Sequence, residues 1–148
     1  MLSKKLILFF SFAIFISSNS TAQEELTWAD FADVEFKREY NAIYELYFLV
    51  PKFGETIKSY EGKKISIKGY FLDIAGNGEV LLLSQRPMAM CFFCGGAGPE
   101  TIIEVNFKQK PSFKTDQIVT LTGVLQLNSE DVDHCNYILN DTTGELVD

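Results

Sequence analysis

The sequence predicts a mainly β protein built around one small five-stranded barrel, with a short helix before the first barrel strand. Residues 63–148 contain five predicted strands: three alternate apolar and polar residues, as half-buried strands do, one is apolar enough to be buried, and the last is short. Gly69 and Gly123 lie inside two of these segments and permit the bends that a closed barrel needs. The chain has 148 residues and is 47% hydrophobic, which is enough for one domain with a proper core.

Composition and charge exclude several classes of protein. An aromatic content of 14% argues against a disordered chain. The formal net charge of −7 argues against nucleic acid as a partner, because such binding needs positive charge to displace counterions from phosphate. Three cysteines are too few for a small disulfide-stapled scaffold.

Residues 1–22 have the three-part pattern of a signal peptide. Two lysines precede the apolar run Leu6–Ile16, and Ser20 and Ala22 occupy the −3 and −1 positions of a cleavage site before Gln23. The apolar run is short for a membrane span, although an uncleaved anchor is the alternative. We therefore expect an exported, periplasmic or extracellular protein with no transmembrane segment in the mature chain. The removed segment carries two lysines and no acids, so the mature net charge becomes −9.

The N-terminal extension, residues 23–62, should pack on the barrel. Thr27 is the expected N-cap of one or two helical turns. Residues 34–50 fit either a helix or two strands, and their aromatic and β-branched side chains favour the extended form. Pro51 should end whatever precedes it, and Phe53–Tyr60 then forms a short amphipathic helix.

The remaining residues, 63–148, form the predicted barrel. A long first strand with a central glycine is typical of the oligonucleotide/oligosaccharide-binding (OB) barrel, in which ligands meet one strand face and two loops. A β-sandwich stays open as the alternative if residues 34–50 supply two more strands. The five predicted strands are Lys64–Ile74, Glu79–Gln85, Thr101–Lys108, Gln117–Leu127 and Asn136–Asn140.

The loop between the second and third strands is the best candidate for chemistry. It holds Cys91 and Cys94 in a Cys-x-x-Cys pair, which can form a structural or redox-active disulfide or supply half of a metal site. A c-type haem is excluded because Gly95, not histidine, follows the second cysteine. The loop residues grouped with this pair are Met90, Gly95 and Gly96.

A second cluster lies between the fourth and fifth strands. It contains Cys135 and His134, the only histidine in the chain. If the two loops meet, Cys91, Cys94 and His134, with Cys135 or Asp133 as the fourth ligand, make a chemically reasonable zinc site. The simpler interpretation is a solvated histidine beside a small buried cysteine. Whether the loops meet depends on strand order, which local patterns do not supply.

One family resemblance covers most of the chain. Residues 60–70 resemble the Leu-x-Gly-Lys-x-Val-x-Ile-x-Gly-Tyr opening of a group of uncharacterised exported bacterial proteins, with Tyr60 at the leucine position. Residues 91–100 (Cys-Phe-Phe-Cys-Gly-Gly-Ala-Gly-Pro-Glu) are similar to their cysteine loop, which precedes a strand with an acidic residue, here Glu104. The similarity runs from about Trp28 to Leu139. It implies an OB-like periplasmic domain, distantly similar to proteins encoded beside zinc-uptake transporters.

Three functions follow from these observations. We expect an exported binding module that is not an enzyme, which holds zinc or a protein partner such as an envelope transporter. An enzyme is less favoured, because the chain has no Gly-x-Ser-x-Gly elbow, phosphate loop or dinucleotide fingerprint. The alternative is a thiol–disulfide redox protein that uses Cys91 and Cys94. An oligosaccharide- or oligonucleotide-binding barrel is the third candidate, and the acidic charge disfavours nucleic acid.

Overall fold

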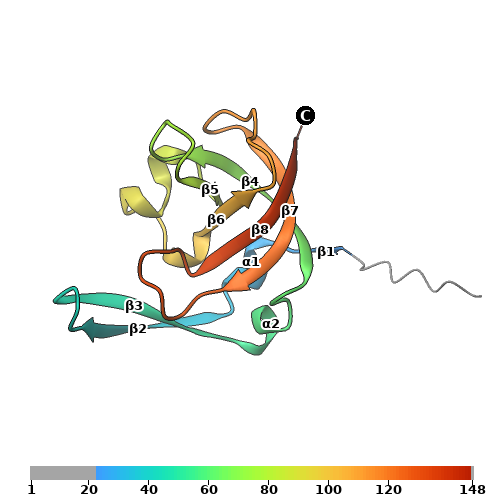
Figure 1. Ribbon diagram of the computed structural model, residues 1–148. Helices are drawn as coiled ribbons and strands as arrows, with labels where there is room; N and C mark the ends of the chain where they lie inside the picture. The colour runs from blue at the N-terminus through green and yellow to red at the C-terminus, as the bar shows by residue number, and fades with distance from the viewer. Residues whose placement is uncertain (1–22, 148) are drawn as a thin grey trace, which may run out of the picture.

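The protein is a small OB-like barrel of five strands, closed by pairing of the first with the fourth (Figure 1). The computed structural model describes residues 23–147, so the expected signal segment lies outside the described residues. Around the barrel the order is β4-β5-β6-β8-β7 and back to β4, and only β6 and β8 run parallel. The predicted fold class is confirmed and the sandwich alternative is wrong. The strands are β4 (Lys64–Asp73), β5 (Leu81–Ser84), β6 (Ile102–Phe107), β7 (Ile118–Leu127) and β8 (Tyr137–Leu146).

The last strand is longer than its pattern predicted. We expected it to end at Asn140, whereas β8 continues to Leu146 and pairs there with Val119 of β7. Its final residues are mostly exposed and polar, so they carry no apolar alternation. Backbone pairing with a long neighbour holds them in the strand instead.

The extension supplies core residues to the barrel. Strand β1 (Glu24–Glu25) pairs with β4, and helix α1 (Trp28–Phe31) begins after Thr27, the predicted N-cap. Helix α2 (Glu55–Lys58) lies just before β4, as predicted. The extension's buried apolar side chains in the barrel core are Leu26, Phe31, Phe53 and Ile57. Among residues 23–147, no helix is long and apolar enough to cross a membrane.

A long hairpin projects from the barrel and is called the arm below (Figure 1). Its strands are β2 (Val34–Asn41) and β3 (Leu46–Phe53), which pair only with each other. The extended interpretation of residues 34–50 is therefore confirmed and the helical one is wrong. Pro51 does not end β3, because a proline is tolerated where its nitrogen faces away from the partner strand. Helix α2 consequently begins only after Phe53.

The cysteine loop covers the outer face of the barrel at β4 and β5. Phe71 and Leu83 face the main core, whereas their neighbours Leu72 and Leu82 pack against Cys91 in a second cluster. These four side chains are at most 2% exposed, so this part of the sheet is buried on both sides. The loop is therefore part of the folded structure and not a free connection.

Gly69 is required by close packing between β4 and its neighbours. A Cβ atom at this position would lie 2.7 Å from the Ser84 carbonyl oxygen and 3.0 Å from the Trp28 ring. We expect Gly69→Ala to lower the free energy of unfolding by about 1–3 kcal/mol through overpacking, measured by urea denaturation. Lys68→Ala, at the exposed neighbouring position, is the control and should change it by less than about 0.5 kcal/mol. Equal stabilities of the two variants would contradict this packing.

Candidate functional site

Three short 3-10 turns shape the cysteine loop between β5 and β6: η1 (Met88–Met90), η2 (Phe92–Cys94) and η3 (Pro99–Thr101). Gly95 ends η2 in the left-handed conformation, with φ 74°. A Cβ atom on Gly96 would lie 2.5 Å from the Met90 carbonyl oxygen. The glycine pair is thus required by the turn that follows Cys94, while the Met90 side chain stays half exposed.

The two cysteines of the pair differ in access to solvent. Cys91 is fully buried and Cys94 is exposed, and all three cysteines of the chain are free thiols. The Cys94 Sγ lies 3.3 Å from the Met88 carbonyl oxygen. Desolvation raises the pKa of the Cys94 thiol, and the neighbouring Cys91 sulfur raises it further. Cys94 is therefore accessible without being activated as a thiolate.

The loop between β7 and β8 is held by Asn128. Its side-chain amide donates to the carbonyl oxygens of Asp131 (2.7 Å) and Cys135 (3.2 Å). Its side-chain oxygen accepts from the Asp131 backbone N–H at 2.9 Å. These bonds fold residues 128–136 into a compact turn that presents its acidic side chains beside β6.

Glu104 of β6 joins this loop to the barrel. Its carboxylate lies 2.8 Å from His134 Nδ1 and accepts the Cys135 backbone N–H at 3.1 Å. The bond to Glu104 raises the pKa of His134, and Asp131 and Asp133 add smaller contributions of the same sign. Burial raises the pKa of the Cys135 thiol to about 12, with the Glu104 charge adding to it. His134 is therefore the one cation of this loop when it is protonated.

The structure brings the two predicted clusters to one side of the barrel. Cys135 packs against the small apolar cluster that contains Cys91, so the loops do meet. His134, however, is directed to Glu104. Among residues 23–147, no group of three or more His, Cys, Asp or Glu side chains is placed to hold a metal ion. As arranged, the predicted zinc ligands do not form a coordination sphere.

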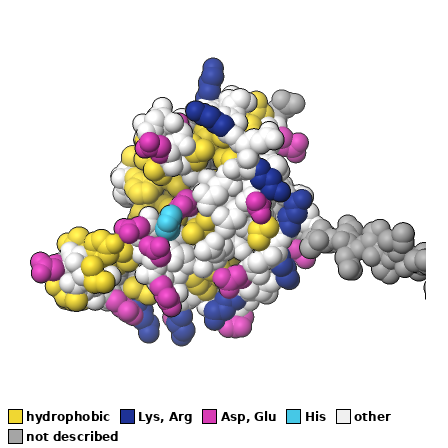
Figure 2. Space-filling view, viewed as in Figure 1, with side chains coloured by type: hydrophobic (Ala, Val, Ile, Leu, Met, Phe, Trp, Pro, Cys, Tyr) yellow, Lys and Arg dark blue, Asp and Glu magenta, His cyan; other side chains and the backbone are white. Residues whose placement is uncertain are grey.

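A groove of about 380 Å³ lies between the arm, the cysteine loop and the β7–β8 loop; it is called the groove below. Its walls are mainly apolar and its rim carries carboxylates. Figure 2 shows acidic side chains gathered around the histidine, with hydrophobic side chains on either side. The groove is lined by Tyr47 to Pro51 of β3, Val80, Leu82, Phe92, Phe93, Pro99, Ile102, Glu104 and residues 129–136.

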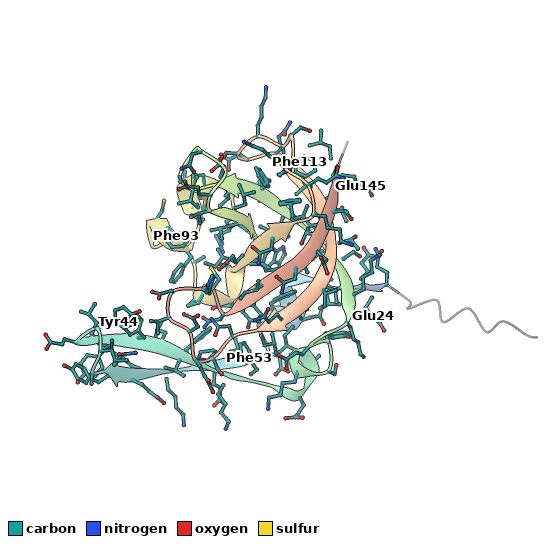
Figure 3. All side chains as sticks on the ribbon, viewed as in Figure 1. Glu24, Tyr44, Phe53, Phe93, Phe113 and Glu145 are labelled. Carbon is teal, nitrogen blue, oxygen red and sulfur yellow. The ribbon has the colours of Figure 1, made fainter. Side chains whose placement is uncertain are left out.

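One contact ties the arm to the acidic loop. The Tyr44 hydroxyl donates to the Asp133 carboxylate at 3.0 Å, and this hydrogen bond raises the pKa of Tyr44. The Tyr44 ring also packs edge-on against Phe48. Figure 3 shows Tyr44 near the outer end of the arm and Phe93 on the loop facing the same side. This hydrogen bond joins the outer end of the arm to the loop that forms one side of the groove.

The sequence patterns did not indicate that Glu104 or β3 belongs to the site. Glu104 was noted only as an acidic strand residue, and residues 34–50 were expected only to be extended and to belong to an extension that packs on the barrel. Tyr47 and Leu49 are instead 60% and 48% exposed. Alternation marks which residues share a face, but it does not show whether that face is covered.

No protein-family model matches the chain, and no curated protein matches it.

The Glu104–His134 pair predicts a titration that NMR can follow. Because the folded-state pKa of His134 is raised, the pair stabilises the fold fully below the unfolded pKa of about 6.5. This stabilisation is lost as the pH rises through the folded pKa. We expect the single histidine to titrate above pH 6.5 by NMR, and Glu104→Gln to move its pKa downward. An unchanged pKa in Glu104→Gln would contradict the pairing.

Proposed function

We propose that this protein is a binding module that acts outside the cytoplasm and is not an enzyme, with its ligand in the groove. The observation that carries the proposal is an apolar groove with an acidic rim, which the arm, the cysteine loop and the β7–β8 loop form together. Apolar pockets with a few convergent polar groups are the usual form of ligand sites. A protein partner in the cell envelope, such as a transporter, fits this form and the resemblance noted above.

The position of the groove supports this proposal. In OB barrels, ligands commonly bind across the second and third strands and beside the loop between the fourth and fifth. Here those strands are β5 and β6, which contribute Leu82, Ile102 and Glu104 to the groove. The corresponding loop is residues 128–136, most of which also line it. The groove therefore occupies the face that this kind of barrel uses for binding.

The chemistry of the groove lining favours binding a ligand over catalysing a reaction. Cys135 is the only thiol that lines the groove, and its pKa of about 12 keeps it protonated. His134 Nδ1 lies 2.8 Å from the Glu104 carboxylate, so the imidazole is paired with a carboxylate and not with a hydroxyl or thiol nucleophile. These groups position and attract a ligand, and none of them is an activated nucleophile.

Selection from a random peptide library tests the groove directly. We expect the mature chain, starting at Gln23, to enrich peptides whose binding requires the groove. The double variant Leu49→Asn with Phe93→Asn removes two half-exposed apolar side chains from it and should weaken the enriched peptides at least about tenfold. Fluorescence anisotropy with a labelled peptide measures this loss.

The matched control removes two apolar side chains from elsewhere on the surface. Ile118 and Leu146 are 38% and 50% exposed, and neither lines the groove. The double variant Ile118→Asn with Leu146→Asn should bind the same peptides as the unchanged protein. No enrichment, or equal losses in both double variants, would count against the groove as the binding site.

A second candidate function is thiol–disulfide exchange by Cys91 and Cys94. The observation that favours it is an accessible thiol beside a buried one. A protein disulfide of the exported compartment would be the oxidant: it accepts two electrons and two protons, Cys91 and Cys94 form one S–S bond, and the oxidant leaves as a dithiol.

Zinc binding by Cys91, Cys94, His134 and Cys135 is the metal version of the main proposal, and it requires these side chains to rearrange.

Thiol and metal counts separate these alternatives. In the reduced mature chain we expect one thiol, Cys94, to react with a maleimide under native conditions, more slowly than a free cysteine because its pKa is raised. Cys94→Ser should remove this reaction, whereas Cys135→Ser should not. Mass spectrometry then counts zinc and free thiols in protein isolated without reductant. Absence of zinc, with no zinc-induced thermal shift, removes the metal version.

A further inference from the structure

The backbone of β3 presents unused hydrogen-bonding groups toward the groove. In the register of the arm, Asp33 lies opposite Gly54, whose N–H donates to the Asp33 carbonyl at 2.8 Å. Hydrogen-bonded and non-hydrogen-bonded pairs alternate along an antiparallel ladder. The pairs formed by Tyr47, Leu49 and Pro51 are therefore the non-bonded ones. Their N–H and carbonyl groups face away from β2, and at Pro51 the missing N–H leaves the β2–β3 ladder intact.

This outward edge lies along the groove. Five successive residues of β3, Tyr47 to Pro51, line it, and no residue of strand β2 does. Among residues 23–147, the outward backbone groups of Tyr47 and Leu49 have no hydrogen-bond partner. A two-stranded hairpin alone is marginally stable in water, and a third strand is the usual way to complete it. An extended chain in the groove would supply that strand.

The charge of the groove indicates which kind of peptide would bind in it. Its lining carries four carboxylates and no lysine or arginine, and these are Glu104, Glu130, Asp131 and Asp133. The arm's Arg38 lies 4.9 Å from the centre of the Tyr47 ring and does not line the groove. Alternate side chains of an added strand point to opposite sides. One row can then meet the apolar walls while the other meets the carboxylates.

We propose that the groove binds an extended peptide of alternating basic and apolar residues, which adds a third strand to the open edge of β3. This inference rests on the proposed binding function and specifies its ligand. Strand addition supplies affinity through main-chain hydrogen bonds, and the flanking side chains supply specificity. A second copy of this chain is a poorer occupant, because pairing two β3 edges would bring two sets of the same carboxylates together.

A synthetic peptide tests the ligand class. The probe is an acetylated, amidated hexapeptide of alternating lysine and valine, with the glutamate–valine peptide as the charge control. We expect the lysine peptide to bind at least about tenfold more tightly, and to weaken as salt is added. N-methylation of every second residue removes one row of N–H groups. At least one of the two N-methylated forms should lose binding, because strand pairing needs that row.

Two variants of Leu49 distinguish the contribution of its backbone N–H to peptide binding from that of its side chain. Leu49→Ala keeps the outward N–H, whereas Leu49→Pro removes it and, as at Pro51, leaves the bonds to β2 intact. We expect Leu49→Pro to bind the lysine peptide at least about tenfold more weakly than Leu49→Ala. Circular dichroism and thermal melting verify that both variants are folded. Glu130→Gln should weaken the lysine peptide and leave the glutamate peptide unaffected or improved.

The outcomes distinguish this inference from the proposed function. Library peptides that require the groove but are neutral or acidic would overturn the inference and leave the binding function standing. Equal binding by Leu49→Pro and Leu49→Ala would overturn strand addition. A dimer of the unchanged chain in light scattering that Leu49→Pro alone disrupts would assign the edge to a second copy. Failure to enrich any groove-dependent peptide would overturn the binding function itself.

Discussion

The buried hydroxyl of Tyr137 connects the N-terminal extension to the barrel. It donates to the Phe31 carbonyl at 2.8 Å, and the Tyr137 ring packs edge-on against Phe31 and Phe53. Tyr137 begins β8, Phe31 ends α1 and Phe53 ends the arm, so one fully buried side chain joins three segments. Without the Tyr137 hydroxyl, the buried Phe31 carbonyl would lack a hydrogen bond to replace the one it makes with water in the unfolded chain. The position of the arm, and hence of the groove, depends on this contact.

A second constraint acts at the opposite wall of the groove. Glu104 holds the β7–β8 loop through His134 and the Cys135 backbone, while Tyr44 holds the arm to Asp133 in the same loop. The acidic loop therefore serves as a bridge between the barrel and the arm. Because the bridge is made of carboxylates, the features that fix the shape of the groove also set its charge. Shape and electrostatic selectivity are coupled at this site.

Local sequence patterns predicted the strands and helices of this protein better than they predicted the contacts between those elements. Three of the five barrel strands follow from alternation of apolar and polar residues. Strand β5 follows from its continuous apolar run, since both of its faces are covered. The arm was ambiguous, since Phe36, Tyr40, Ile43 and Tyr47 also have helical spacing. Pro51 was expected to end a strand, yet a proline fits where its nitrogen points outward. That distinction depends on which pairs of a ladder are hydrogen bonded, and a single strand does not encode it.

From the sequence alone, a mainly β domain with a short helix before its barrel could be derived, together with the unusual cysteine loop. These are local properties, set by side-chain period, glycine and proline chemistry and composition. Only the tertiary structure decided that the cysteine loop and the His134 loop share one side of the barrel, and that Glu104 engages the histidine. Pairings such as that of β6 with β8 join residues more than thirty positions apart, and local patterns carry no information on them. The groove exists because of those long-range pairings.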